Sequence, residues 1–295
     1  MARRLLKKND KTLIIDADSL LYEAASVNES TFDFSEDNQV VVLDEEGARK
    51  SLDEAIEKLK DNTKCSKTQL YLTGKTNFRY DILPTYKHNR KDLPKPQLLP
   101  MLKEYAVTKY GAKITTKIEA DDACSIHLSN DPINNILAHI DKDLNQVEGE
   151  HYNWRKDLRY ELSYAQGQRV FFTQVLTGDS TDGYGGCKGI GKKKAEEILN
   201  EYLKWQISLE GNKIVKKALP CKDIWEAILS WYMKPYYDKC EGDIDNYFMY
   251  ANDDAIVQAR VARMLRVDEF KGGKPILWSY EPLNIDLRNA HLPTL

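Results

Sequence analysis

Three short apolar runs, separated by stretches with helical spacing, are the feature of this sequence that most restricts its fold. The runs are residues 13–15, 69–73 and 135–140, and each has the length of a buried strand. Residues 47–60 carry apolar side chains at helical spacing, and residues 98–110 are also predicted to be helical. This alternation predicts an α/β fold with a mainly parallel central sheet flanked by helices.

The pattern changes after about residue 170, where helices and a glycine-rich loop replace strands. We expect residues 1–170 to form the α/β core, including a basic segment at 84–117. Residues 171–295 are expected to form a helical layer, packed with the core as one unit. Further elements expected from the sequence are a strand at 112–118, a helix from Glu119, and helices at 170–176, 192–205, 222–233 and 254–266.

Composition excludes several classes of protein. The chain has 295 residues, of which 42% are hydrophobic and 30% charged, as in an ordinary soluble globular protein. Its apolar stretches are far shorter than the roughly 20 residues of a membrane helix, and residues 1–10 lack the apolar stretch of a signal peptide. We therefore expect a cytosolic protein without membrane contact. Five cysteines without a Cys-x-x-Cys pair indicate neither disulfides nor a cysteine zinc site.

The charge of the chain is unevenly distributed. The net charge is only −3, but between Gly74 and Lys117 ten basic residues stand against three acids. Such a local excess indicates an anionic partner.

Acidic residues cluster where the apolar elements end. They form four groups, which are Asp16; Glu119, Asp121 and Asp122; Asp141 and Asp143; and Asp179 and Asp182. Ligands of an open α/β sheet lie at the carboxyl ends of its strands, where these groups can converge. Carboxylates sharing one pocket need divalent cations, and oxygen ligands favour Mg²⁺ or Mn²⁺, at two positions about 4 Å apart. Any one group alone is more simply a helix cap or turn, but the four together favour a metal site.

A glycine-rich loop with three lysines occupies residues 185–194. It imitates a nucleotide-binding loop, but Lys193 stands where a metal-binding Ser or Thr belongs and no strand precedes it, so we reject that interpretation. We expect a helix-hairpin-helix over about 174–205, whose backbone N–H groups approach a DNA phosphate. A plain helix connection with a solvated lysine face is the alternative. The residues expected to contact DNA here are Gly189, Ile190, Gly191, Lys192, Lys193 and Lys194.

Five spaced motifs between residue 12 and about residue 200 carry a resemblance to a known family. They are Leu13-Ile14-Ile15-Asp16-Ala17-Asp18; Phe78-Arg79 with Leu83-Pro84, Tyr86-Lys87 and Asn89-Arg90; Glu119-Ala120-Asp121-Asp122; Asp141-Lys142-Asp143; and Gly178-Asp179-Ser180-Thr181-Asp182-Gly183 followed by Gly189-Ile190-Gly191. In this order they resemble the 5′ nuclease family of flap endonucleases and 5′-to-3′ exonucleases, most of all its bacteriophage replication branch. The resemblance implies a PIN-like α/β core and phosphodiester hydrolysis that leaves 5′-phosphate products.

The resemblance also implies roles for individual residues. The acids expected to ligate or support a first metal ion are Asp16, Glu119, Asp121 and Asp141; those of a second are Asp143, Asp179 and Asp182; and Asp18 and Asp122 act through water. The expected catalytic residues are Asp141 and Asp179 with Lys87 and Arg90, which hold the reacting phosphate at the base of an arch. Arg79, Tyr86 and Lys91 are expected DNA contacts, and a K⁺ ion is expected at the hairpin.

Some of these features have alternatives or depart from the family. Tyr86 either stacks on an end base or is a half-buried aromatic at a helix start. Many relatives carry an Asp shortly after the second strand, where this chain has Gly74. The segment from Lys87 to Glu119 is short and rich in proline, so a long arch is not expected. His139 is interpreted as a strand residue rather than a ligand.

The function expected from these observations is a divalent-metal-dependent 5′ nuclease, acting on the 5′ ends of duplex, nicked or flapped DNA in phage replication, recombination or primer removal. We expect a monomer in the host cytosol, and no protein partner is indicated. An RNase acting on RNA–DNA hybrids is one alternative, because nothing in the sequence distinguishes the sugar. A catalytically weak protein that only binds branched DNA is another.

Overall fold

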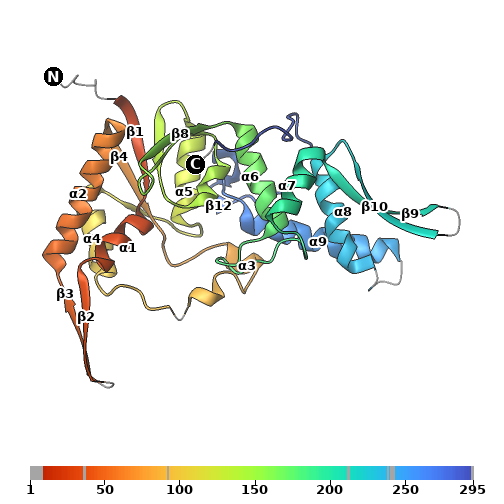
Figure 1. Cartoon of the computed structure of the whole chain (residues 1–295). Helices are drawn as coiled ribbons and strands as arrows, with labels where there is room; N and C mark the ends of the chain where they lie inside the picture. The colour runs from red at the N-terminus through yellow and green to blue at the C-terminus, as the bar shows by residue number, and fades with distance from the viewer. Residues whose placement is uncertain are drawn as a thin grey trace. The chain divides into compact units, whose positions relative to one another are not determined.

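The structure is a computed structural model that describes residues 9–35, 38–91, 93–210, 213–237, 239 and 243–293. Cys240 and residues 1–8, which entered the sequence arguments, lie outside the described residues. The chain forms two compact units. Unit 1 comprises Met1–Asn77, Asp92–Leu162 and Met264–Pro275, and unit 2 comprises Phe78–Lys91, Ser163–Arg263 and Ile276–Leu295 (Figure 1). The expected division at residue 170 stays a prediction.

Unit 1 is built on a six-stranded sheet with the order β5-β4-β1-β6-β7-β8. Every neighbouring pair from β5 to β7 is parallel, and only β8 is antiparallel to its neighbour. The predicted mainly parallel α/β sheet is therefore confirmed. The strands are β1 (Asn9–Asp16), β4 (Cys65–Leu72), β5 (Lys113–Ile114), β6 (Asn135–Ala138), β7 (Gly149–Asn153) and β8 (Leu158–Leu162).

Helices cover both faces of this sheet because successive side chains of β1 point to opposite sides. Leu13 and Ile15 pack against α1 (Ala17–Ser26), α2 (Glu45–Thr63) and α4 (Leu99–Tyr110), and Ile14 packs against α5 (Ala120–Asn130). The predicted helices at 47–60 and 98–110 thus correspond to α2 and α4. Short elements complete the unit: η2 (Lys142–Gln146), η3 (Val267–Glu269), β11 (Phe270–Lys271) and β12 (Lys274–Pro275).

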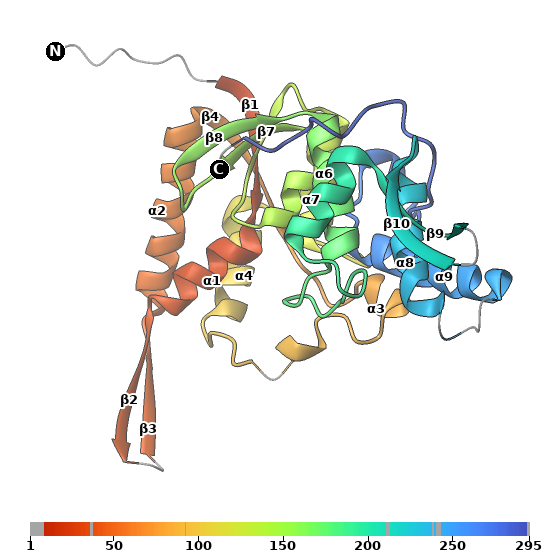
Figure 2. The same ribbon diagram turned by 45° about the vertical axis from the view of Figure 1, so that its right-hand side comes forward.

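Two parts of unit 1 differ from the sequence-based prediction. The chain between α1 and α2 forms an antiparallel hairpin of β2 (Glu29–Ser35) and β3 (Asn38–Leu43), which extends away from the sheet of its unit (Figures 1 and 2). The expected strand at 112–118 is limited to the two residues of β5. Thr115 explains this, because its hydroxyl donates to the carbonyl oxygen of Ile118 and turns the chain toward α5.

Unit 2 is mainly helical around one aromatic-rich core that includes Phe171, Trp225 and Tyr232. Its elements are α3 (Arg79–Ile82), η1 (His88–Arg90), α6 (Tyr164–Thr177), α7 (Lys192–Glu201), β9 (Leu203–Glu210), β10 (Lys213–Pro220), α8 (Ile224–Tyr237) and α9 (Ile244–Ala262). None of the described helices is both long and apolar enough to span a bilayer.

Two helices of unit 2 end earlier than the sequence suggested. The helix expected at 192–205 stops at Glu201, because Tyr202 adopts a left-handed conformation with φ of 51°. The chain then forms the β9–β10 hairpin, which the sequence-based prediction missed. The helix expected at 254–266 begins ten residues earlier, behind the N-cap Asp243, and ends at Ala262 because Arg263 is extended.

Candidate active site

The acids of unit 1 gather at the carboxyl edge of its parallel sheet. Asp16 is the last residue of β1, and Asp141 follows the neighbouring strand β6 and caps η2. Thr73 follows β4, and its hydroxyl accepts from the backbone N–H of Ala120 at 2.9 Å. This bond fixes the start of α5 at the same edge, with Glu119 as N-cap and Asp121 in the first turn. The fold therefore places the acids expected for the first metal ion at one edge of the sheet.

Asp16 is the most perturbed carboxylate of this group. It is 3% exposed, and its Oδ1 is buried without a hydrogen-bond partner. Burial, together with the charges of Asp18 and Asp141, raises the pKa of Asp16 to about 7. The same acids act on a neighbouring thiol: burial raises the pKa of Cys124, and Asp16 and Asp121 add to the shift. An unpartnered buried carboxylate oxygen among other acids is a place that a cation would stabilise.

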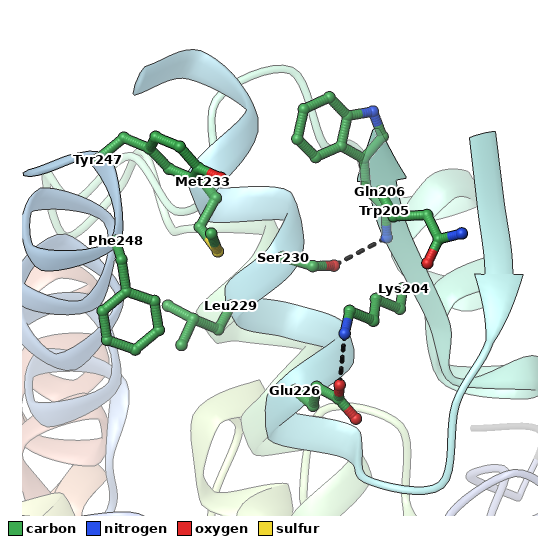
Figure 3. Close-up of a pocket in the computed structure, with 9 residues that line it drawn as sticks. All are labelled: Lys204, Trp205, Gln206, Glu226, Leu229, Ser230, Met233, Tyr247 and Phe248. Carbon is green, nitrogen blue, oxygen red and sulfur yellow. Dashed lines mark hydrogen bonds and ion pairs between the residues drawn. The ribbon is translucent and has the colours of Figure 1, made fainter. Parts of the chain in front are cut away.

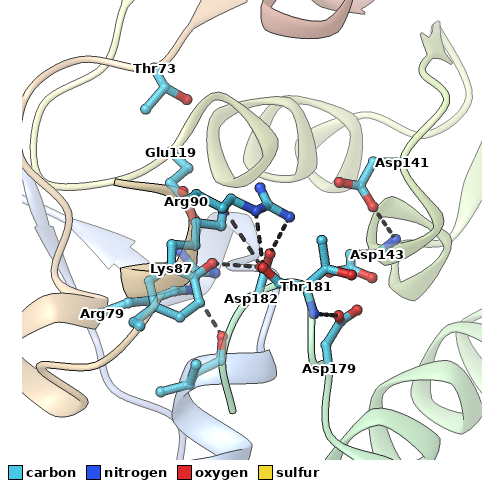
Figure 4. A network of polar contacts seen from close by, with 12 residues as sticks. Thr73, Arg79, Lys87, Arg90, Glu119, Asp141, Asp143, Asp179, Thr181 and Asp182 are labelled. Atoms are coloured by element: carbon cyan, nitrogen blue, oxygen red, sulfur yellow. Dashed lines mark hydrogen bonds and ion pairs between the residues drawn. The ribbon is translucent and has the colours of Figure 1, made fainter. Parts of the chain in front are cut away.

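The donor set fits a hard divalent cation. It consists of carboxylate oxygens, the ligands that Mg²⁺ and Mn²⁺ prefer. Within the described ranges, no three acidic, histidine or cysteine side chains are already arranged closely enough to hold an ion. Mutual repulsion keeps these carboxylates apart unless a cation compensates their negative charge. Asp143 is 8% exposed, and its N–H donates to the Oδ1 of Asp141 at 2.8 Å, which orients that carboxylate (Figure 4).

Two of the acids are held by other partners. Asp122 is fully buried, and its two oxygens accept from the backbone N–H groups of Glu119 and Leu265. The bond from Glu119 is part of a capping box at the start of α5. Both bonds occupy the carboxylate, and they do not support the expectation that Asp122 serves a metal ion. Asp18 accepts from the N–H of Thr73 at 2.8 Å and pairs with Lys103 at 3.2 Å. Lys103 was missed by sequence reasoning, because a lysine on a helix gives no signal of its own.

The position of Gly74 has no room for a side chain. A Cβ atom at this position would lie 2.0 Å from the carbonyl oxygen of Thr115. No side chain fits there without moving the segment between β5 and α5. His139 is also part of the scaffold: it is 1% exposed, and its Nδ1 lies 2.6 Å from the carbonyl oxygen of Asp141.

In unit 2, Asp182 lies at the centre of a cationic network (Figure 4). It pairs with Arg90 at 2.8 Å and with Lys87 at 3.6 Å. The hydroxyl of Tyr86 donates to it at 2.9 Å, and its carbonyl oxygen accepts from the N–H of Lys87 at 2.8 Å. Asn89, to which sequence reasoning gave no role, donates to the carbonyl oxygens of Ser180 and Thr181. The motif around Lys87 is thus tied to the loop that carries Asp182.

The same loop holds Asp179. Its backbone pairs with Tyr184 in an isolated bridge, and its Oδ1 accepts from the N–H of Thr181 at 2.8 Å (Figure 4). Two glycines make this tight turn possible. Gly178 and Gly186 have φ of 65° and 61°, and a Cβ atom on either would lie within 2.5 Å of the other strand of the turn.

Two expected DNA contacts are buried inside unit 2. Arg79 is 0% exposed, and its guanidinium donates to the carbonyl oxygens of Val261 and Arg263. Tyr86 is 1% exposed and belongs to the aromatic core. This burial does not support stacking of Tyr86 on a base or contact of Arg79 with DNA. In contrast, Lys91 is exposed, and Arg90 is partly exposed.

The glycine-rich hairpin between α6 and α7 has the open surface that a backbone contact requires. Cβ atoms placed on Gly189 or Gly191 would meet nothing within 4 Å, and Gly189 has φ of 80°. Ile190 is 8% exposed and anchors the loop in the core. Lys192 and Lys193 are exposed in the first turn of α7, whereas Lys194 pairs with Glu197 and lies over the ring of Trp231.

The fold is that of the 5′ nucleases, and comparisons with known proteins confirm the predicted resemblance. No family model matches the chain. It is 25% identical over 278 residues to the exonuclease of Escherichia phage T7, covering 88% of this chain and 89% of that protein. It is 26% identical over 231 residues to a 5′-3′ exonuclease of Bacillus subtilis, covering 71% and 76%.

Solved structures agree on the fold. The 5′-exonuclease of bacteriophage T5 with bound zinc superposes with a TM-score of 0.52 at 17% identity, covering 84% of this chain and 99% of that one. A T5 structure co-crystallised with metal ions gives the same TM-score at 15% identity and the same coverage.

Proposed function

We propose that this protein is a divalent-metal-dependent 5′ nuclease that hydrolyses phosphodiesters at the 5′ ends of duplex, nicked or flapped DNA during phage-type replication or primer removal. The observation that carries the proposal is Asp16, a buried carboxylate with an unpartnered oxygen at the sheet edge where Glu119 and Asp141 also lie. It stands in a chain that is similar to named exonucleases over most of its length.

The proposed metal ligands are Asp16, Glu119, Asp121 and Asp141, with Asp143, Asp179 and Asp182 supporting a second ion. Bound Mg²⁺ or Mn²⁺ would polarise the phosphate and lower the pKa of a coordinated water. Asp143 would act on the first site through its N–H bond to Asp141. Two similar structures of the T5 enzyme contain metal ions, which supports a bound divalent ion.

Lys87 and Arg90 are proposed to hold the reacting phosphate. Asp182 keeps both cations in place before DNA arrives, so little side-chain entropy is lost when a phosphate binds them. Arg90 is further fixed by its Nε, which donates to the carbonyl oxygen of Thr181 at 3.0 Å. Positive charge at this position would stabilise the negative charge that develops on the phosphate oxygens.

The hairpin at residues 178–191 is proposed to bind the DNA backbone, with K⁺ as a candidate ion at its carbonyls. The open space at Gly189 and Gly191 lets a phosphate reach the N–H groups at the start of α7, where Lys192 and Lys193 add charge. Such contacts position a duplex without reading its sequence. A protein that only bound DNA would gain nothing from uncompensated acids, which repel phosphate.

The test uses a nicked duplex and a 5′-flap duplex, each labelled at the 5′ or the 3′ end of the nicked strand. We expect Mg²⁺-dependent release of short products from the 5′ label by the wild type, and none in EDTA. Asp141→Asn should lose this activity, whereas Asp61→Asn, the same change at an exposed position of α2, should keep it. Replacing the nicked DNA strand with RNA tests the hybrid substrate in the same assay.

Three outcomes would contradict the proposal. The first is release that begins at the 3′ label, the second is full activity in EDTA, and the third is full activity of Asp141→Asn. Tight binding of both duplexes without cleavage in Mg²⁺ or Mn²⁺ would indicate a DNA-binding protein instead.

A further inference from the structure

Unit 1 contains two buried histidines that the proposed chemistry does not use. His139 is 1% exposed and His151 is 0% exposed. Burial of an imidazole costs free energy unless its nitrogens are hydrogen-bonded, and an apolar side chain would fill the same space without that cost. The groups to which the two rings bond therefore indicate what the rings do.

Both rings bond to the turn at residues 141–147, which carries Asp141 and Asp143. The Nδ1 atom of His139 lies 2.6 Å from the carbonyl oxygen of Asp141, directly before η2. The Nε2 atom of His151 lies 3.0 Å from the carbonyl oxygen of Val147, directly after η2. A carbonyl oxygen only accepts, so each of these two nitrogens carries a proton and donates it. The turn is thus held at both of its ends by an imidazole.

Tyr160 adds a third point of attachment. Its hydroxyl donates to the Oδ1 of Asn145, within the same turn, at 2.7 Å, and lies 3.3 Å from the Nε2 of His139. Its ring stacks on the ring of His151, with centroids 5.3 Å apart and an angle of 11° between the planes. The rings of His139 and His151 are also in contact, with centroids 5.1 Å apart. We call the packed group of His139, His151 and Tyr160 the imidazole clamp.

The sheet of unit 1 fixes the imidazole clamp. His151 on β7 and Tyr160 on β8 lie opposite each other in the antiparallel pair. The backbone N–H of His139 donates to the carbonyl oxygen of Tyr152 on β7 at 3.1 Å. Asp141, in contrast, lies beyond the end of β6. The clamp therefore fixes a turn outside the sheet relative to the sheet.

Polar groups that only join two elements look different, as the pocket of unit 2 shows. This pocket of about 360 Å³ lies between β9, α8 and the start of α9 (Figure 3). Lys204 pairs there with Glu226, and the hydroxyl of Ser230 accepts from the N–H of Trp205. Both contacts join β9 to α8, whereas the contacts of the imidazole clamp end on the turn that carries proposed metal-site acids.

The position of this turn matters because the acids at the sheet edge repel one another. Asp141 shares that edge with Asp16 and Glu119, and like charges move apart unless something holds them. The N–H of Asp143 donates to the Oδ1 of Asp141 at 2.8 Å, so the backbone of the turn also directs this carboxylate (Figure 4). A turn that relaxed would have to be ordered again when a cation binds, which would weaken the binding.

We infer that His139 and His151, supported by Tyr160, are positioning residues of the proposed metal site. They hold the turn at residues 141–147 in one place, so that the carboxylate of Asp141 meets a divalent cation without reordering. Outer partners of metal ligands typically contribute about 10- to 100-fold to metal affinity. The inference rests on the proposed function, because it assumes that Asp141 binds the ion.

The test measures the affinity of the full chain for Mn²⁺ in the absence of DNA, from the electron paramagnetic resonance signal of free Mn²⁺. It needs no cleavage. His151→Phe keeps a ring to stack on Tyr160 but loses the donor to Val147. We expect this variant to raise the dissociation constant of Mn²⁺ about tenfold or more. Thermal unfolding in EDTA, measured separately, identifies any variant that does not fold.

Amide substitutions give a sharper test, because an amide replaces only one of the two imidazole nitrogens. The amide nitrogen of Gln can take the place of Nε2, and that of Asn the place of Nδ1. His151→Gln should therefore keep the affinity for Mn²⁺ within a few fold of the wild type, and His151→Asn should lose it. At the other ring the order reverses: His139→Asn should keep the affinity and His139→Gln should lose it. General destabilisation of the fold would not produce this reversal.

His127→Phe is the matched control. His127 is a half-buried histidine of α5, and its Nδ1 lies 3.2 Å from the hydroxyl of Tyr71. This variant loses a buried polar contact of unit 1 outside the imidazole clamp, and it should keep the affinity for Mn²⁺. Tyr160→Phe removes only a hydroxyl and provides a second test if His151→Phe does not fold. It should raise the dissociation constant by a smaller factor.

Failure of this inference is distinguishable from failure of the proposed function. Unchanged affinity for Mn²⁺ in folded His151→Phe, or absence of the reversal between the amide variants, would overturn the positioning inference alone. An equal loss of affinity in His127→Phe would also overturn it, because any change in unit 1 would then weaken the site. Absence of Mn²⁺ binding by the wild type, or equally tight binding by Asp141→Asn, would overturn the proposed metal site and the inference with it.

Discussion

Asp16 in unit 1 and Asp182 in unit 2 are both buried carboxylates of predicted metal sites, yet their surroundings are opposite. Asp16 has an unpartnered oxygen and a pKa raised to about 7 by burial and by neighbouring acids. Asp182 accepts from Tyr86 and pairs with Lys87 and Arg90. The comparison shows that an acid in a motif can be left uncompensated, as a metal ligand would be, or can be paired with cationic side chains of its own chain.

This difference assigns separate tasks to the two carboxylates. A buried charge without compensation costs stability, which only a bound ion or a proton restores. Burial of a compensated carboxylate costs less stability, and the carboxylate orients the cationic side chains around it. We therefore propose Asp16 as a metal ligand and Asp182 as the residue that positions Lys87 and Arg90.

The largest expected effect is on cleavage by Asp16→Asn. We expect the rate in saturating Mg²⁺ to fall by about a thousandfold or more, because loss of a negative ligand weakens the metal site that lowers the barrier. Single-turnover cleavage of a 5′-labelled flap measures it, with Asp61→Asn as the control. Cleavage within a few fold of the wild type would mean that Asp16 is only a structural residue.

Lys87→Ala should reduce kcat by about a hundredfold with a smaller change in KM, since its charge is proposed to act on the phosphate in the transition state. Lys58→Ala removes an exposed lysine of α2 and should change neither. A rise in KM alone would limit Lys87 to substrate binding.

The comparison also predicts that the same change, Asp→Asn, affects the stability of the fold in opposite directions at the two positions. In EDTA at neutral pH, Asp16→Asn should stabilise the fold by about 2 kcal/mol, because it removes an uncompensated buried charge. Asp182→Asn should destabilise it by about 2 kcal/mol, because Lys87 and Arg90 lose their partner. Urea unfolding measures both.

Mg²⁺ provides the companion measurement. It should raise the stability of the wild type by binding the folded state, and it should have little effect on Asp16→Asn. Shifts of equal sign for the two variants in EDTA would remove the distinction between the two carboxylates.

The smallest expected effect concerns Asp53, a compensated carboxylate of unit 1. Burial by itself would raise its pKa, but hydrogen bonds from Lys109, Tyr110 and Tyr105 lower it below the ordinary value. A lowered pKa stabilises the fold above the unfolded-state pKa of about 4, and this contribution is lost as the pH falls through the lower folded-state pKa. Asp53→Asn should cost about 1 kcal/mol at pH 7.

The pH dependence supplies the control for that prediction. The difference between wild type and Asp53→Asn should shrink as the pH falls below about 4, where the carboxylate of the wild type becomes protonated. Asp61→Asn, at an exposed position of the same helix, should show no such change. A difference that is constant with pH would assign the effect to packing.

Local sequence patterns were sufficient to predict the main strands of unit 1 and the sheet edge at which its acids lie. Strand-length apolar runs located β1, β4 and β6, and the acids after them reached one sheet edge because parallel strands share a direction. The sequence also contains a signal for the β9–β10 hairpin. Residues 204–210 alternate polar and apolar side chains, and the Gly211-Asn212 pair that follows is typical of a hairpin turn.

Spacing alone did not separate ligands from scaffold. Asp121 and Asp122 are adjacent in the motif, but the N3 position of α5 directs Asp122 to backbone N–H groups of Glu119 and Leu265. Leu265 is distant in sequence, so no local pattern indicates this bond. The same holds for Arg79, whose acceptors Val261 and Arg263 lie at the end of α9.

The sequence by itself determined the alternation of strands and helices, the set of acids and the chemistry that such acids support, because these follow from periodicity and residue type. Only the tertiary structure decided which polar side chains are already satisfied. Hydrogen bonds and ion pairs depend on groups brought together from distant parts of the chain, as the contrast between Asp16 and Asp182 shows.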